Sequence, residues 1–466
     1  MTLKLAVALS TSVVLVSACG GSVAPGVDPE PIAVADAAAD GGADTSSAPD
    51  TRADVTPADT RPEVDTAEAA PVDTGPVVDH GAPSTKYPAF APVMPQLVNH
   101  GGAVLLKPVL VTVTFPSEKN VDAYEAFDDN LGPTSYWKEV ASEYGVGPTV
   151  SDAIDHVRMT TTLPDAMDDG ELDTYVGEHA LNYAKYGWPA PTDQTIYVLV
   201  IPPTTAVSLS GRDTCSTGIG GFHTSTTVGA IEVAYAIVLQ CTDPGVTPRL
   251  QSVTASHEIG EAATDPHPQL GFQGFEGVDD DDIAWRIMQN GAVENGDLCE
   301  NDPDARYRDT VDPGFAYRVQ RQWSNASSKL GHNPCVPVPP DPYFNVVGLE
   351  LEKVTFNASD FGLSSRLATR GYHVAVGETK TFPIGFWSDG PTAAWTLAVQ
   401  EGTPFAAPPK VSRLDVSLDK YTGSNGEKAY VTVTVKSATG RKASILTIQS
   451  SDGGTEHYMP ILISSQ

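Results

Sequence analysis

The hydrophobic pattern between residues 87 and 337 predicts strands that alternate with helices. The runs 103–115 and 195–201 are rich in β-branched and other apolar residues, which is typical of buried strands. Apolar positions recur at helical spacing over 121–144 and 171–186, and a further helix is predicted over 250–263. This alternation favours an α/β fold over a helix bundle or a sandwich.

The pattern changes beyond a proline-rich stretch, for which we expect a semi-rigid linker over 338–345. Residues 346–466 contain about eight short alternating segments separated by glycine and asparagine turns, which predicts an all-β, immunoglobulin-like sandwich. Histidines do not cluster in this last part, and it contains no cysteine. We therefore expect it to act as a spacer or as an adhesion module.

The first residues resemble an export signal. Lys4 precedes an apolar run over 5–16, and this run is too short to span a membrane. Val16-Ser17-Ala18-Cys19 resembles a bacterial lipobox, which predicts a signal peptide over 1–18 and lipidation of Cys19. The alternative is an ordinary secretory signal with an incidental cysteine. If the lipobox is functional, the protein belongs to the bacterial cell envelope and is lipid-anchored at the outer membrane or cell surface.

Residues 19–86 are dominated by alanine, aspartate, proline, threonine and valine, with almost no aromatic residues. Such a segment buries too little apolar surface to fold, so we expect a disordered, extended tether. The formal net charge of the 466-residue chain is −31. This charge argues against nucleic acid as a partner.

The segment 256–266 carries the strongest chemical signal in the chain. His257 and Glu261 are four residues apart, so a helix places them on one face, with Glu258 beside them. Helices with an H-E-x-x-H motif hold zinc in this way, and a zincin-like form of the α/β fold is therefore one prediction. A carboxylate at the second ligand position also suits calcium, manganese or iron. The alternative is an ordinary helical ion pair.

Four cysteines remain after Cys19. An even number in an exported chain favours two disulfides, and their order in the sequence suggests Cys215–Cys241 and Cys299–Cys335. Three connectivities remain open at this point. A metal cluster is less favoured because the four cysteines lack C-x-x-C spacing.

A set of short motifs stands in a fixed order between Pro95 and Pro337. In sequence order the motifs are Cys215, Gly220-Gly221-Phe222-His223, Tyr235-Ala236, Cys241, Ser256-His257-Glu258 with Glu261, Ala262, Thr264 and Pro266, Trp285, Glu294-Asn295-Gly296-Asp297-Leu298-Cys299-Glu300, Gln322-Trp323-Ser324-Asn325 and Cys335. This ordered set resembles the plant phosphate-induced, or EXORDIUM-like, family of secreted proteins. The family usually has a second cysteine where this chain has Gly220, so one family disulfide is missing or rewired here. The resemblance implies an exported, disulfide-bearing protein of cell-wall or extracellular context, and it does not decide between an enzyme and a binding protein.

The same motifs extend the candidate site. We expect zinc or another divalent metal on His257, Glu261 and Asp297, with Glu258 as general base. His223, in a predicted glycine-rich loop, is a fourth ligand, an orienting group or an oxyanion-stabilising group in this hypothesis. The alternatives are a histidine that caps backbone groups and an aspartate in an Asx turn.

Two functional hypotheses follow. The first is a surface-anchored metallohydrolase, most simply a peptidase that acts on extracellular peptides. The second is a non-catalytic surface protein that binds an extracellular ligand or a cell-envelope polymer. Other features need no functional explanation. We expect the acidic run 279–282 to form a solvated loop, and Trp285 and Trp323 to be core residues.

Overall fold

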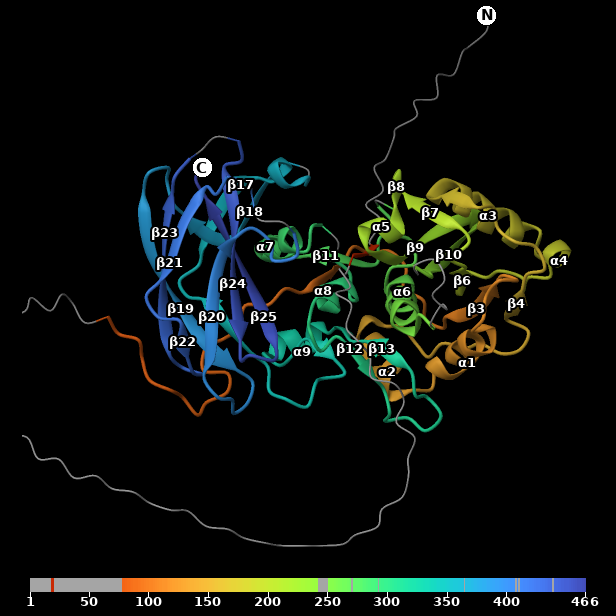
Figure 1. Ribbon diagram of the computed structural model, residues 1–466, viewed down its shortest axis with the longest axis horizontal. Coiled ribbons are helices and arrows are strands. Elements are labelled where there is room, and N and C mark those ends of the chain that lie inside the picture. The colour runs from red at the N-terminus through yellow and green to blue at the C-terminus, as the bar shows by residue number, and fades with distance from the viewer. Residues whose placement is uncertain are drawn as a thin grey trace, which may run out of the picture. The chain divides into compact units, whose positions relative to one another are not determined.

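The computed structural model of the protein describes residues 78–241, 250–269, 271–291, 293–363, 365–406, 409, 411–437 and 440–466, and the backbone of 18–20 (Figure 1). The expected signal segment up to residue 17 and residues 21–77 of the expected tether lie outside these ranges. Among the helices in these ranges, none combines the length and apolar character needed to cross a membrane.

A six-stranded mixed sheet forms the centre of the first part. Its central strands are parallel, and Val198 pairs with Thr112 on one side and with Ala236 on the other. The expected α/β layer is therefore observed. The strand order is β1 (Ala18–Gly20), β9 (Ile219–Val228), β10 (Ile231–Leu239), β6 (Thr195–Ile201), β3 (Val109–Thr114) and β4 (His156–Arg158), with β9 antiparallel to both of its neighbours.

Helices cover both faces of this sheet. Successive side chains of a strand point to opposite faces, so Ile196 and Val198 pack in one core and Tyr197 and Leu199 in another. The first core also contains residues of α1 (Val121–Leu131), α2 (Ser135–Ala141) and α6 (Ser252–Thr264). The second contains residues of α3 (Asp169–Leu181). The helix with the His-Glu motif therefore packs directly on the sheet.

The single helix expected over 121–144 is wrong, because the chain forms α1, α2 and the 3-10 turn η1 (Ser142–Tyr144) instead. The break falls at Gly132-Pro133, where the proline has no backbone N–H to continue the helical hydrogen bonds. Thr134 then caps α2, since its side chain accepts a hydrogen bond from the Trp137 backbone N–H.

The second part consists of two sheets that share one hydrophobic core. Ile384 and Val431 from the first sheet pack in the same core as Ile448 and Ile461 from the second. The first sheet contains, in order, β16 (Phe344–Gly348), β19 (Thr379–Ser388), β23 (Lys428–Val435) and β21 (Leu414–Leu418). The second contains β17 (Glu352–Asn357), β18 (Arg366–His373), β25 (Glu456–Ser464), β24 (Ala443–Ser451), β20 (Trp395–Glu401) and β22 (Thr422–Gly423).

Two element boundaries differ from the expected segments. Strand β16 begins at Phe344, inside the expected linker, because the run of prolines ends at Pro342 and Phe344 is buried. At the other end, the Ser84 backbone exchanges hydrogen bonds with Asn425, although residue 84 falls in the expected tether. The last residues of that segment are thus bound to the β-sheet part.

Each disulfide joins two consecutive cysteines of the four, which confirms the suggested pairing of Cys215 with Cys241 and of Cys299 with Cys335. Shorter elements complete the described chain. They are β2 (Leu97–Asn99), β5 (Ala166–Asp168), α4 (Tyr183–Tyr186), β7 (Ala206–Leu209), β8 (Arg212–Asp213), α5 (Thr214–Thr217), β11 (Phe275–Val278), η2 (Asp280–Asp282), α7 (Ile283–Met288), α8 (Asp297–Glu300), β12 (Arg306–Arg308), β13 (Arg318–Gln320), β14 (Gln322–Trp323), α9 (Asn325–Leu330), β15 (Cys335–Val336) and η3 (Ala358–Phe361).

Candidate metal centre

Helix α6 is enclosed along most of its length. Every residue from Ala255 to Thr264 is buried, and small or apolar positions such as Ile259 and Ala262 pack into the core of the sheet. The polar positions of the helix lie against strand β9 and against the segment that leads into α8. A helix buried on all sides brings its carboxylates out of water, so each of them requires a partner.

His257 and Glu261 lie side by side on α6, as their spacing predicts. The His257 Nε2 atom is 2.9 Å from Glu261 Oε1 and 3.8 Å from Asp297 Oδ1. Gly296 allows the neighbouring backbone to approach this pair, because a Cβ at that position would lie 2.8 Å from both the His257 ring and Glu261 Oε1. His257 is therefore close to both of the other expected ligands, although neither close triad of possible ligand atoms in the described residues includes Asp297.

The segment 294–297 is held in place by residues of β13 and β14. Gln320 donates from its side chain to the Gly296 carbonyl at 2.9 Å, and Asn295 donates to the Gln322 side chain at 2.8 Å. The Trp323 backbone N–H donates to the Asn295 carbonyl. The disulfide from Cys299 to Cys335 fixes the end of the same segment. These contacts fix the position of the acidic residues in the segment.

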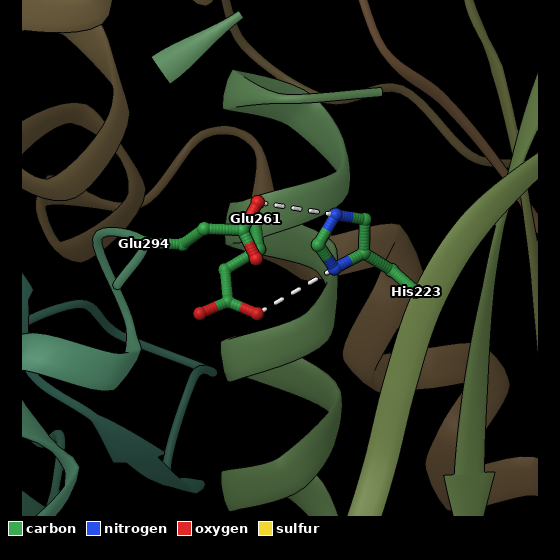
Figure 2. Close-up of side chains that lie close together, drawn as sticks. All are labelled: His223, Glu261 and Glu294. Carbon is green, nitrogen blue, oxygen red and sulfur yellow. Dashed lines mark ion pairs between the residues drawn. The ribbon is translucent and has the colours of Figure 1, made fainter. Parts of the chain in front are cut away.

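His223 lies in strand β9, so its expected place in a glycine-rich loop is wrong. Residues 224–227 are serine and threonines, which pair with β10 as a regular ladder. Figure 2 shows the imidazole between two carboxylates: Nδ1 is 3.5 Å from Glu261 Oε2, and Nε2 is 3.5 Å from Glu294 Oε1. The Nε2 atom is also 3.1 Å from the Asp265 carbonyl oxygen, a backbone contact of the kind weighed as an alternative.

Several buried carboxylate oxygens of this cluster have no hydrogen-bond partner. They are both oxygens of Glu258, both oxygens of Glu294 and Oε2 of Glu261. All three side chains are at most 1% exposed. Two triads have possible ligand atoms within 4.8 Å of one another, His257-Glu258-Glu261 and His223-Glu261-Glu294. Oxygens left without donors in this number are the chemistry that a cation satisfies.

The electrostatics of the cluster separate its carboxyl groups. Burial raises the pKa of Glu258, and it raises the pKa of Glu294 well above the usual range. Burial also acts to raise the pKa of Glu261, but the adjacent His257 and His223 lower it to about 2. Burial opposes protonation of His223, but the neighbouring carboxylates raise its pKa well above the ordinary value, and Glu294 has the largest effect among them. Glu261 is thus the ionised member at the centre.

Glu294 is the site residue that the sequence hypothesis missed. The hypothesis chose Asp297 from the acidic element 294–300, whereas the structure places Glu294 in a triad with His223 and Glu261. Asp297 begins α8, and its Oδ2 accepts a hydrogen bond from the Glu294 backbone N–H at 2.9 Å. The available signal was the position of Glu294 at the start of the element, three residues before Asp297.

The other candidate features have structural explanations. In the acidic run 279–282, Asp281 forms an ion pair with Lys353 and Asp282 with Arg370. Trp285 and Trp323 are buried and pack edge to face, with ring centroids 5.9 Å apart, as core residues do.

The sequence matches no protein-family model and no curated protein. Among solved structures, the trigonal form of titin M4 aligns over 21% of this chain and 86% of its own, with 9% identity and a TM-score of 0.14. A Bacteroides ovatus GH5 xyloglucanase aligns over 21% and 17%, with 18% identity and a TM-score of 0.14. A family 123 glycoside hydrolase from Clostridium perfringens aligns over 27% of each chain, with 7% identity and a TM-score of 0.15. Scores this low carry no argument about fold or activity.

Proposed function

We propose that the buried cluster binds a divalent metal ion, zinc or a related ion, and that the chain is a metal-dependent hydrolase of the peptidase type. The observation that carries this proposal is the set of buried carboxylate oxygens without hydrogen-bond donors around His257 and Glu261. Nitrogen and carboxylate donors are the usual ligands of catalytic zinc.

The distances fit a shared ion. Two ligand atoms, each about 2 Å from a tetrahedral zinc, lie about 3.4 Å apart. The separations are 2.9 Å from His257 Nε2 to Glu261 and 3.8 Å from the same atom to Asp297. Asp297 belongs to neither close triad of possible ligand atoms in the described residues, so it would move toward the ion to complete the set.

Glu258 is the residue that we assign to proton transfer. It follows His257 directly, and neither of its oxygens has a hydrogen-bond partner. Burial raises its pKa above that of an ordinary glutamate, which strengthens it as a base. A metal bound beside it would supply a water of lowered pKa. Glu258 would then accept the proton of that water, and His223, 3.8 Å away, orients its carboxylate.

Metal analysis of the purified full-length chain, combined with peptide hydrolysis, tests this proposal. Wild type should contain bound metal and cleave peptides, whereas Glu258→Gln should retain metal and lose cleavage. The exposed Glu232 on β10 provides a matched control, and Glu232→Gln should change neither property. Wild-type protein without metal, even after incubation with zinc or manganese, would contradict the proposal.

A non-catalytic role is the second candidate, and the burial of the cluster favours it. His223, His257, Glu258 and Glu261 are each 0% exposed, and closed coordination is typical of structural zinc sites. In that case the protein binds an extracellular ligand or a cell-envelope polymer, and the ion stabilises the fold. Metal-loaded protein that cleaves no peptide in a broad peptide library would favour this role.

We also propose that the chain is exported and lipid-anchored through Cys19 at the bacterial cell envelope. Two disulfides support an oxidising compartment. Wild type should partition with membranes and Cys19→Ala should be released, and a soluble wild type would contradict the anchor. Nucleic acid is not a proposed partner, given the net charge of −31.

The resemblance to the EXORDIUM-like family remains part of the proposal, with a zincin-like α/β part and an immunoglobulin-like β part that acts as spacer or adhesion module. The mixed sheet beneath α6 and the shared core of the two C-terminal sheets support this description. An experimental structure of a plant member that lacks the sheet and the His-Glu cluster would contradict it.

A further inference from the structure

The two oxygens of the Glu261 carboxylate face two different histidines. Oε1 lies 2.9 Å from His257 Nε2, and Oε2 lies 3.5 Å from His223 Nδ1. His257 comes from the same helix, whereas His223 comes from strand β9 on the other side of the carboxylate. A carboxylate that bridges two metal ions presents its oxygens in this way, one to each ion.

The contacts of His223 indicate which of its nitrogens is available. A carbonyl oxygen can only accept a hydrogen bond, so the 3.1 Å contact with the Asp265 carbonyl requires a proton on Nε2. In the neutral ring, Nδ1 then carries a lone pair. Nδ1 lies 3.5 Å from Glu261 Oε2 and 3.8 Å from Glu258 Oε2, an arrangement that needs a positive charge, either a proton on Nδ1 or a metal ion between the atoms. Metal-binding histidines commonly donate their other N–H to a backbone carbonyl.

Glu294 supplies an independent indication at the other nitrogen of the same imidazole, where its Oε1 lies 3.5 Å from His223 Nε2. Its side chain is 1% exposed, and neither of its oxygens has a hydrogen-bond partner. It reaches the cluster from a segment fixed by Gln320 and by the Cys299–Cys335 disulfide. With His223 and Glu261 it forms a triad whose ligand atoms lie within 4.8 Å of one another. One ion at His257 would leave both oxygens of Glu294 without a ligand or a hydrogen-bond donor.

We propose that the cluster binds two divalent ions, bridged by the carboxylate of Glu261. One ion is held on the Oε1 side by His257 together with Asp297. The second is held on the Oε2 side by His223 and Glu294. This inference rests on the proposed function, because it requires that the cluster binds metal at all, and it makes the centre a two-metal site with ions about 3.5–4 Å apart.

The test is a count of ions per chain, combined with a measure of their separation. Full-length protein is stripped with a chelator, reloaded with Mn²⁺, dialysed and analysed for metal and protein. Wild type should bind two ions per chain, and its electron paramagnetic resonance spectrum should show an exchange-coupled pair. Glu294→Gln should bind one ion, without coupling. The exposed control Glu232→Gln should resemble wild type.

The outcomes separate this inference from the proposed function. No bound ion in wild type overturns both. A single ion in wild type, with the same count in Glu294→Gln, overturns only the second site and leaves His223 as an imidazolium that neutralises Glu294. Two ions without exchange coupling overturn the bridging role of Glu261. The wild-type count and spectrum decide the question even where Glu294→Gln fails to fold.

Discussion

Glu261 Oε1 lies 2.9 Å from His257 Nε2, one helical turn away on a helix with no exposed face. Burial makes this pair expensive unless further charge stabilises it, since a buried ion pair often fails to recover its cost of desolvation. A bound divalent ion would recover it.

Replacement of Glu261 by glutamine should remove the stabilisation that metal provides. At a free metal concentration of 100 times Kd, a site that binds only the folded chain adds about 2.7 kcal/mol to its stability. We expect a chelator to lower the free energy of unfolding of wild type by this order and to leave Glu261→Gln almost unaffected. Denaturant titrations with and without chelator measure the difference. A wild type that is indifferent to chelator would contradict the expectation.

Gly296→Ala should weaken metal binding, because the added Cβ would lie 2.8 Å from the His257 ring and from Glu261 Oε1. The backbone of Gly296 has a φ of −75°, which alanine adopts readily, so the effect is steric. Gly454→Ala is the control, since its Cβ would meet no atom closer than 3.6 Å. Calorimetric titration with zinc should show weaker binding only for Gly296→Ala. Equal affinities in the two variants would mean that the ion does not contact this pair.

The chemistry of α6 could be predicted from the sequence, because helical spacing alone brings His257 and Glu261 together. The pairing of the cysteines followed from their order. The proximity of His223 to Glu294 could not be predicted from local spacing or sequence order. Their contact depends on the antiparallel turn of β9 onto β10 and on how Gln320 and Gln322 hold the segment before α8. No local pattern encodes such long-range packing.

The boundaries of helices and strands were also predicted from the sequence only in part. The strand expected over 195–201 matches the bounds of β6, and all seven of its residues are buried. The helix expected over 121–144 is interrupted at Gly132-Pro133, a local signal that the apolar spacing of Trp137 and Val140 concealed. In the C-terminal part, residues 349–351 form the connection between β16 and β17, and Glu352 begins β17.

The two disulfides should differ in their effect on the site. They close loops of similar length, with sequence separations of 26 and 36, so their entropic contributions differ by only about 0.3 kcal/mol. We expect replacement of either pair by serine to cost about 2–4 kcal/mol of stability. Only loss of Cys299–Cys335 should also reduce metal affinity, since it frees the segment that carries Glu294 and Asp297. Equal metal affinity in both double variants would show that this segment does not help to hold the ion.

Asp128, far from α6 in sequence and buried in α1, should make stability depend on pH. Burial raises its pKa from 3.8 to about 7, while Thr112 donates a hydrogen bond to it at 2.6 Å. Between these values the folded chain holds a proton that the unfolded chain has released, so stability falls as the pH rises from about 4 to 7. The change amounts to up to about 4 kcal/mol.

Asp128→Asn should flatten this part of the pH profile, as measured by denaturant unfolding at several pH values. The charged neighbours Glu125, Asp129 and His156 remain in both proteins, so the comparison isolates one group. An unchanged slope between pH 4 and 7 would show that Asp128 does not carry the proton.

The most direct measurement is an anomalous-scattering crystal structure of the full-length chain, grown with zinc and recorded on both sides of the zinc absorption edge. We expect an anomalous peak about 2 Å from a nitrogen of His257 and from an oxygen of Glu261. A map without a peak between these two residues, or with zinc only on surface carboxylates, would contradict it.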